Sequence, residues 1–258
     1  LKADLDSAAI LNRQAKALNM KSGDPMSAGK LIFLDAKIDK EGGRKTIAFS
    51  NMKQAISYFE KHHFKEQAGE AYNELSYMYD NKPEYFDTKI KLKEKALELL
   101  KNSGSKLNQA GVLKDLGELY YIKENSDKAL GLLKESLSVY QSVKFRELQS
   151  VYNLISQVEI QKADYEEALR YGLLAEKTAE SVNDYSLQMC SIYSNIGMVY
   201  YYLRKNDDAM KYWEKSLATA KKNKDNGYIR TVANNISTML IRQKKFKQAI
   251  TMIQEYRE

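Results

Sequence analysis

The residue types that most often carry out catalysis are scarce in this chain. Its 258 residues include two histidines, His62 and His63, and one cysteine, Cys190. Adjacent residues of a helix point about 100° apart, so the two imidazoles are poorly placed to ligate one metal ion. Cys190 falls in an apolar helical stretch, where a free thiol behaves as a small hydrophobic side chain, whereas a catalytic thiol needs a basic partner. The sequence therefore predicts no catalytic residue, no metal site and no cofactor.

Glycine-rich and tyrosine-rich stretches point to no other chemistry. The segments "EGGR" at 41–44 and "NSGS" at 102–105 lack the preceding strand of a phosphate-binding loop, and both are typical of turns. The run "YYY" at 200–202 spreads over three directions of a helix. It predicts inward packing for Tyr200 and a groove-facing position for Tyr201, and no base-stacking platform.

Composition and charge favour a soluble helical protein. The chain has 41 Lys and Arg against 34 Asp and Glu, a net charge of +7, and only two prolines. Basic and acidic residues alternate, as in "DKALGLLKES" at 127–136, which is typical of solvated helix faces and gives little support for nucleic-acid binding. No apolar run is long enough to span a membrane. The compartment stays open between the cytoplasm and the extracytoplasmic part of a membrane-anchored regulator.

One pattern recurs along the chain. Residues 116–120, Leu-Gly-x-x-Tyr, correspond to Ile-Gly-x-x-Tyr at 196–200. Nine residues after each tyrosine comes an alanine, and four further on comes a large apolar residue, Leu133 or Trp213. Less regular copies place a small residue at the same position, and the set Ser76, Gly117, Ser156, Gly197 and Ser237 is spaced by 41, 39, 41 and 40. A period near 40 with two helices per repeat indicates a solenoid.

The pattern resembles that of the tetratricopeptide repeat family, W-x2-L-G-x2-Y followed by A-x3-F. It departs from the family in its longer period, in the missing closing proline, and in Tyr152 and Tyr193 at the tryptophan position. These features are similar to the longer-repeat branch found in peptide-sensing bacterial regulators and kinesin light chains. The resemblance implies an all-α, right-handed superhelical solenoid of antiparallel helix hairpins. It also implies that Gly197 lets the two helices of its repeat approach closely and that Trp213 fills the space beside it.

The repeat predicts five helix pairs in residues 69–258. Their expected bounds are 67–80 with 85–101, 107–122 with 126–142, 147–162 with 165–182, 187–203 with 206–222, and 228–243 with 246–257. Residues 1–68 are expected to form diverged helical hairpins, with "KEGGRK" at 40–45 interrupting a helix and Ala55 and Phe59 at the alanine and aromatic positions. No polar capping helix follows the last pair, so we expect either a dimer or a longer natural chain.

In the family, the groove is lined by first-helix residues placed three before and one after the small residue. Residues at i, i+4 and i+7 share that face. The implied peptide-binding positions are Asn73, Tyr77, Lys114, Glu118, Tyr121, Asn153, Gln157, Ser194, Tyr201 and Asn234. Three of the five repeats carry asparagine at the first position, and its amide can pair with the backbone of an extended peptide, as groove asparagines do in the peptide-sensing regulators. The alternative is that asparagine is merely a tolerated polar residue on an exposed face.

These residues favour binding over catalysis. The predicted partner is an extended peptide or protein segment, and the predicted role is the sensor or scaffold part of a larger bacterial regulatory protein. One alternative is an assembly module that forms a homodimer through the apolar stripe Phe246, Ala249, Ile250 and Ile253. Another is a peptide-controlled regulator of a separate enzyme.

Overall fold

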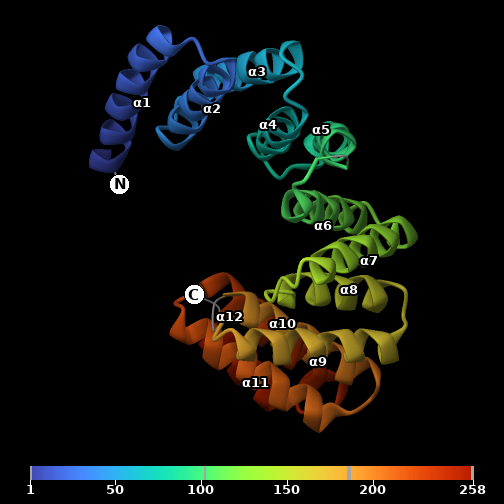
Figure 1. Ribbon diagram of the computed structural model, residues 1–258. Helices are drawn as coiled ribbons and strands as arrows, with labels where there is room; N and C mark the ends of the chain where they lie inside the picture. The colour runs from blue at the N-terminus through green and yellow to red at the C-terminus, as the bar shows by residue number, and fades with distance from the viewer. Residues whose placement is uncertain (1, 102, 185–186, 257–258) are drawn as a thin grey trace. The chain divides into compact units, whose positions relative to one another are not determined.

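The structure is a computed structural model that describes residues 2–101, 103–184 and 187–256. The described residues form thirteen helices (Figure 1). They are α1 (Lys2–Ser22), α2 (Pro25–Glu41), α3 (Lys45–Lys61), α4 (Lys65–Tyr77), α5 (Pro83–Leu100), α6 (Lys106–Ile122), α7 (Ser126–Ser142), α8 (Gln149–Gln161), α9 (Tyr165–Ser181), α10 (Leu187–Tyr202), α11 (Asn206–Lys222), α12 (Asn226–Arg242) and α13 (Phe246–Glu255).

The helices after α1 follow one another in pairs, and the all-α prediction is confirmed. We call the first helix of each pair A and the second B; the A helices are α2, α4, α6, α8, α10 and α12. The five predicted pairs from α4 to α13 agree with the observed bounds within three residues. Of the predicted positions, residue 102 in a turn and the helix end at 257 lie outside the described residues.

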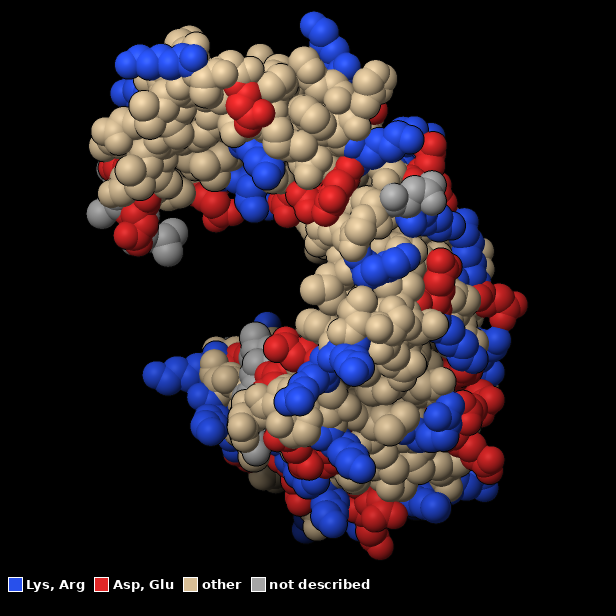
Figure 2. Space-filling model, in the orientation of Figure 1, with Lys and Arg blue, Asp and Glu red and all other residues tan. Residues whose placement is uncertain are grey.

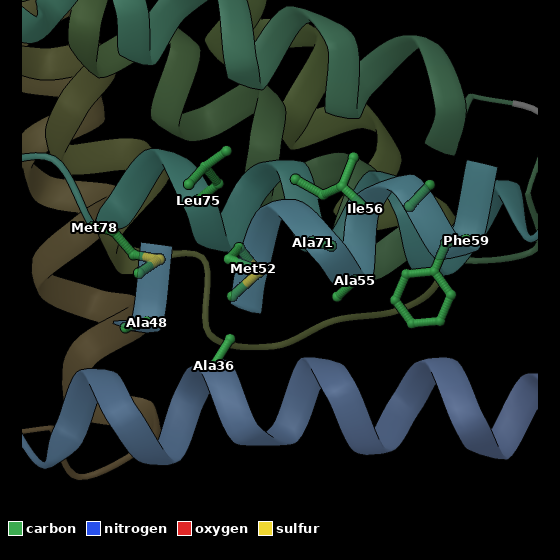
Figure 3. Close-up of a cluster of buried hydrophobic side chains, with 10 residues drawn as sticks. Ala36, Ala48, Met52, Ala55, Ile56, Phe59, Ala71, Leu75 and Met78 are labelled. Carbon is green, nitrogen blue, oxygen red and sulfur yellow. The ribbon is translucent and has the colours of Figure 1, made fainter. Parts of the chain in front are cut away.

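The chain divides into two compact units, Leu1–Leu119 and Tyr120–Glu258. In the first unit, α2, α3 and α4 share a buried cluster that includes Ala36, Met52 and Leu75 (Figure 3). In the second unit, buried clusters form around Leu133 and Ile155 and around Trp213 and Ile236. The predicted change at residue 68, from diverged hairpins to regular repeats, is a change in sequence regularity and stays a prediction.

A short turn joins the two helices of each pair and sets the repeat length. Glu124, Ala163, Arg204 and Lys244 lie in these turns with φ between 57° and 61°, the left-handed conformation that ends many helices. Their spacings are 39, 41 and 40 residues. Gly43 takes the same place between α2 and α3 with φ of 74°. The period near 40 therefore extends to the α2/α3 pair.

This turn corrects the expected frame of the first hairpin. "KEGGRK" is the turn between α2 and α3, and it leaves three residues, 42–44, between the two helices. Counted from the start of α3, Ala48 and Met52 hold the places that Ala209 and Trp213 hold in α11, and both are buried. The alanine and large apolar positions are thus Ala48 and Met52. Ala55 and Phe59, predicted for these places, lie two turns later.

The mid-helix glycine at 197 is explained by the close approach of α10 and α11. A Cβ atom on Gly197 would lie 2.6 Å from Cδ1 of Trp213. The Trp213 side chain is 2% exposed, and its indole N–H donates to the carbonyl oxygen of Ser194 at 3.1 Å. Trp213 shares a buried cluster with Val232 and Ile236 of α12. It therefore joins its own repeat to the next one.

Candidate functional site

In the first unit, predicted groove residues of α4 and α6 gather around a lysine of α5. Lys93 donates from Nζ to Oδ1 of Asn73 and to Oδ2 of Asp115, both at 2.8 Å. Its Nζ also lies 3.9 Å from the ring centroid of Tyr77, whose hydroxyl donates to the same Asp115 oxygen. Lys114 adds a longer ion pair to Oδ1 of Asp115 at 3.5 Å. The helix-face prediction thus brought Asn73, Tyr77 and Lys114 together, but it missed Lys93 and Asp115.

Lys93 and its neighbour Lys89 occupy positions that other repeats fill with apolar residues. Each lies 40 residues before its counterpart, Lys89 before Ala129 and Lys93 before Leu133. The two lysines are 5% and 2% exposed. Lys89 donates to Oδ1 of Asn81. Lysine at the alanine and large apolar positions of one repeat was the signal in the sequence that could have found this cluster.

Burial changes the acid–base behaviour of these groups. Burial lowers the pKa of the Lys93 ammonium, whereas the Asp115 carboxylate raises it. Partial loss of hydration raises the pKa of the Glu118 carboxyl, and Asp115 adds to that effect, although Glu118 is exposed. Partial loss of hydration and the Asp115 carboxylate also raise the pKa of Tyr77, which is 45% exposed, and burial raises the pKa of Tyr121. The cluster therefore combines a buried ammonium group with more exposed hydrogen-bonding groups.

In the second unit, Asn153 of α8 is a bridge to α10. Its side-chain Nδ2 donates to Oγ of Ser191 at 3.1 Å, and its Oδ1 accepts from Nδ2 of Asn195 at 2.8 Å. Asn153 is 6% exposed. At this position, asparagine is therefore more than a tolerated polar residue on an exposed face.

The other predicted positions of the second unit differ in burial. Asn234 is exposed, Gln157 and Tyr121 are half-buried, and Ser194 is buried. Tyr201 is half-buried, with its ring centroid 5.8 Å from that of Trp213. We refer to the ten predicted positions as the A-helix face, of which Asn73, Tyr77, Lys114 and Glu118 lie in the first unit.

The observed bonds limit what two of the asparagines can offer a ligand. The side-chain oxygen Oδ1 of Asn73 accepts a hydrogen bond from Lys93, and Oδ1 of Asn153 accepts one from Asn195. Each amide nitrogen carries two hydrogens. Asn153 uses one for Ser191. The side-chain N–H groups of the two asparagines that are not used in this way suit a ligand carbonyl oxygen.

Of the histidines and the cysteine, His62 and Cys190 pack against other side chains, whereas His63 is exposed. His62 lies beside two aromatic rings, with ring centroids 4.5 Å from Tyr58 and 5.8 Å from Phe64. Cys190 is buried, and burial raises the pKa of its thiol. Across residues 2–101, 103–184 and 187–256, no three His, Cys, Asp or Glu side chains are grouped as metal ligands would be.

Charge and hydropathy add two observations. Basic and acidic side chains are interspersed on the face of each unit that Figure 2 shows, without one large patch of a single sign. Of the helices in the described part of the chain, none combines the length and the apolar character needed to cross a bilayer.

Comparison with known proteins identifies a repeat family for part of the chain and several proteins of similar structure. Residues 188–258 match the family model for the tetratricopeptide repeat, and no curated protein matches the chain. The apo form of RapI is similar in structure, with a TM-score of 0.74 and 15% identity over 99% of this chain and 92% of RapI. BtubC from P. vanneervenii gives a TM-score of 0.73 and 17% identity over 87% of this chain and 92% of BtubC.

A third similar structure contains a bound factor. It is a Rap protein complexed with competence and sporulation factor, with a TM-score of 0.66 and 16% identity over 99% of this chain and 74% of that protein. At identities this low, the structural similarity shows a common fold alone. The chain is thus a tetratricopeptide-like repeat protein, and its residues 188–258 carry the sequence signature of the tetratricopeptide repeat family.

Proposed function

We propose that this chain is a protein-interaction module that binds an extended peptide on its A-helix face, as the sensor or scaffold part of a regulatory protein. The observation that carries the proposal is the fixed orientation of the Asn73 and Asn153 side chains, whose Oδ1 atoms accept hydrogen bonds from neighbouring side chains. A side chain held in place loses less conformational entropy when it binds a ligand. An extended peptide presents the carbonyl oxygens that the remaining N–H groups require.

Two proteins of similar structure support the proposal. One is a Rap protein complexed with competence and sporulation factor. The other, from Pyrococcus horikoshii, is a signal-transduction ATPase with a tetratricopeptide repeat sensor; this chain covers 41% of it, with a TM-score of 0.73 and 16% identity. Both make a sensing role for this chain a testable expectation.

The test is a display screen of random peptides against the full chain, followed by titration of a recovered peptide. Asn73→Ala removes an N–H donor of the first unit and Asn234→Ala removes one of the second unit, and each variant is tested alone. A lost hydrogen bond weakens binding by roughly 0.5–1.5 kcal/mol, so we expect an affinity about 2- to 13-fold lower in the variant whose unit binds the peptide. Asn153 is left unchanged because it joins α8 to α10.

Asn226→Ala is the matched control, because Asn226 is exposed at the start of α12, the helix that carries Asn234. It should bind the peptide as the wild type does, and melting curves should show that all variants are folded. Wild-type affinity in both Asn73→Ala and Asn234→Ala would place the peptide site elsewhere.

A second candidate function is self-association through α13. Ala249 is buried, but Phe246, Ile250 and Ile253 are 56%, 54% and 42% exposed. A cluster of exposed apolar side chains often marks a protein interface. Sedimentation of the full chain should show a concentration-dependent dimer, and Ile250→Glu should reduce it. A strict monomer at high concentration would reject this candidate.

A further inference from the structure

A cavity of about 480 Å³ lies in the second unit where α10 and α12 end. Its lining residues are Tyr201, Tyr202, Arg204, Asn206, Met239, Arg242 and Gln243. This volume is within the range of small-molecule sites, which combine an apolar lining with a few polar groups that fix the ligand. The residues that are not charged supply two aromatic rings, a thioether and two amides.

The charge in this cavity is positive. Arg204 and Arg242 line it, no carboxylate does, and neither arginine forms an ion pair with another residue in the described part of the chain. Asp207 and Asp208 line an adjoining cavity, which they share with Arg204 and two lysines, Lys205 and Lys245. A guanidinium group matches a carboxylate or a phosphate with two parallel hydrogen bonds. The cavity therefore has the charge and the donors that an oxyanion requires.

The aromatic residues of the cavity are held in place. The Tyr202 ring stacks on Tyr165 at 4.8 Å between centroids, and the Arg242 guanidinium lies 5.3 Å from the ring centroid of Tyr201. The Tyr201 hydroxyl is buried and makes no hydrogen bond within the described residues. A buried polar group without a partner is unfavourable, so a ligand that supplies an acceptor here gains affinity.

We propose that this cavity binds an organic oxyanion, that is, a carboxylate or phosphoryl group attached to an aromatic or apolar body. Arg204 and Arg242 bind the oxygen atoms, while the body lies against Tyr202 and Met239. The A-helix-face asparagines Asn73, Asn153 and Asn234 do not line this cavity, although Tyr201 belongs to both the A-helix face and the cavity. The arginine variants below leave those asparagines unchanged, so the two proposals are tested separately.

The single tryptophan of the chain provides the readout. Trp213 lies 5.8 Å from Tyr201 between ring centroids, so a ligand that moves Tyr201 should change Trp213 fluorescence. The full chain is titrated at constant ionic strength with phenyl phosphate, with phenylacetate and with uncharged benzyl alcohol. We expect saturable changes with at least one of the two anions and none with the alcohol. The anion that binds more tightly identifies the group as phosphoryl or carboxylate.

N-acetyl-phosphotyrosine amide distinguishes two sources of the same chemistry. Tighter binding than phenyl phosphate indicates a group carried by a peptide, and weaker binding indicates a free small molecule.

Arginine variants test the assignment of the site. Arg204→Gln combined with Arg242→Gln should weaken binding of the anion at least tenfold without changing the melting temperature. Arg230→Gln is the matched control, since Arg230 is exposed on α12, the helix of Arg242. An unchanged affinity in the double variant, an equal loss in Arg230→Gln, or no saturable change in the wild type would each overturn the proposal.

Discussion

Replacing Lys93 with leucine is expected to lower the free energy of unfolding by about 3–5 kcal/mol, because removing one partner of a buried ion pair leaves the other charge uncompensated. The side chains of Lys93 and Asp115 are only 2% and 11% exposed, and their charged atoms are 2.8 Å apart. Leucine is the residue at the equivalent position, 133, of the next repeat. A sequence comparison of the repeats alone would therefore predict that this substitution is harmless.

A second substitution should restore most of the lost stability. In the next repeat, Leu133 and Leu154 are members of one apolar cluster, at the positions equivalent to Lys93 and Asp115. Lys93→Leu with Asp115→Leu copies that pair, and replacing both members of a buried ion pair by packed apolar residues is often neutral or stabilising. Tyr77 loses its acceptor but is 45% exposed, so water can take that place. Urea unfolding of Lys93→Leu, of Asp115→Leu and of the double variant measures the coupling energy between the two residues. A Lys93→Leu variant as stable as the wild type, or a double variant as unstable as Lys93→Leu, would contradict this expectation.

Gly197→Ala should destabilise the protein by about 1–3 kcal/mol, the usual result of overpacking a core. The added methyl group would lie 2.6–3.0 Å from three atoms of the Trp213 ring, which is buried and hydrogen-bonded. Helix propensity acts in the opposite direction, since alanine is favoured over glycine by about 1 kcal/mol. The sign of the measured effect therefore shows whether packing or propensity decides at this position.

Gly131→Ala is the matched control. Gly131 lies within α7, and a Cβ atom there would meet no heavy atom within 4 Å. The same substitution should therefore stabilise the protein by roughly 0.5–1 kcal/mol. Thermal and urea unfolding of both variants measure the difference. Equal effects of the two substitutions would show that α10 and α11 are not as close as the structure places them.

The repeat architecture could be predicted because its physical requirements recur in the sequence. A small residue such as Gly197 is needed where two helices cross closely, and small residues recur at this position near every 40 residues. The α2/α3 pair was assigned the wrong frame for a specific reason. The segment around Gly42 and Gly43 was predicted to interrupt a helix, whereas Gly43 occupies the left-handed turn position that Arg204 and Lys244 fill elsewhere.

The side-chain network of the candidate site was less predictable. The helix period predicted that Asn73, Tyr77 and Lys114 lie on one face of the A helices. It could not predict Lys93, because this residue contacts them from a B helix. Asn153 and Asn234 share one position in the repeat, yet Asn153 is buried and Asn234 is exposed. Their burial depends on the neighbouring helix, where Ser191 and Asn195 contact Asn153. A helix-face pattern does not contain that information.

The most direct test of peptide binding on the A-helix face is a double-mutant cycle between Asn73 and a backbone carbonyl of the bound peptide. Each carbonyl of a recovered peptide is replaced in turn by an alkene isostere, and every peptide is titrated against the wild type and Asn73→Ala. We expect one carbonyl whose removal is coupled to Asn73 by roughly 0.5–1.5 kcal/mol, with additive effects at the other positions. Additive effects at every carbonyl would contradict this expectation, because Asn73 would then donate to no part of the peptide backbone.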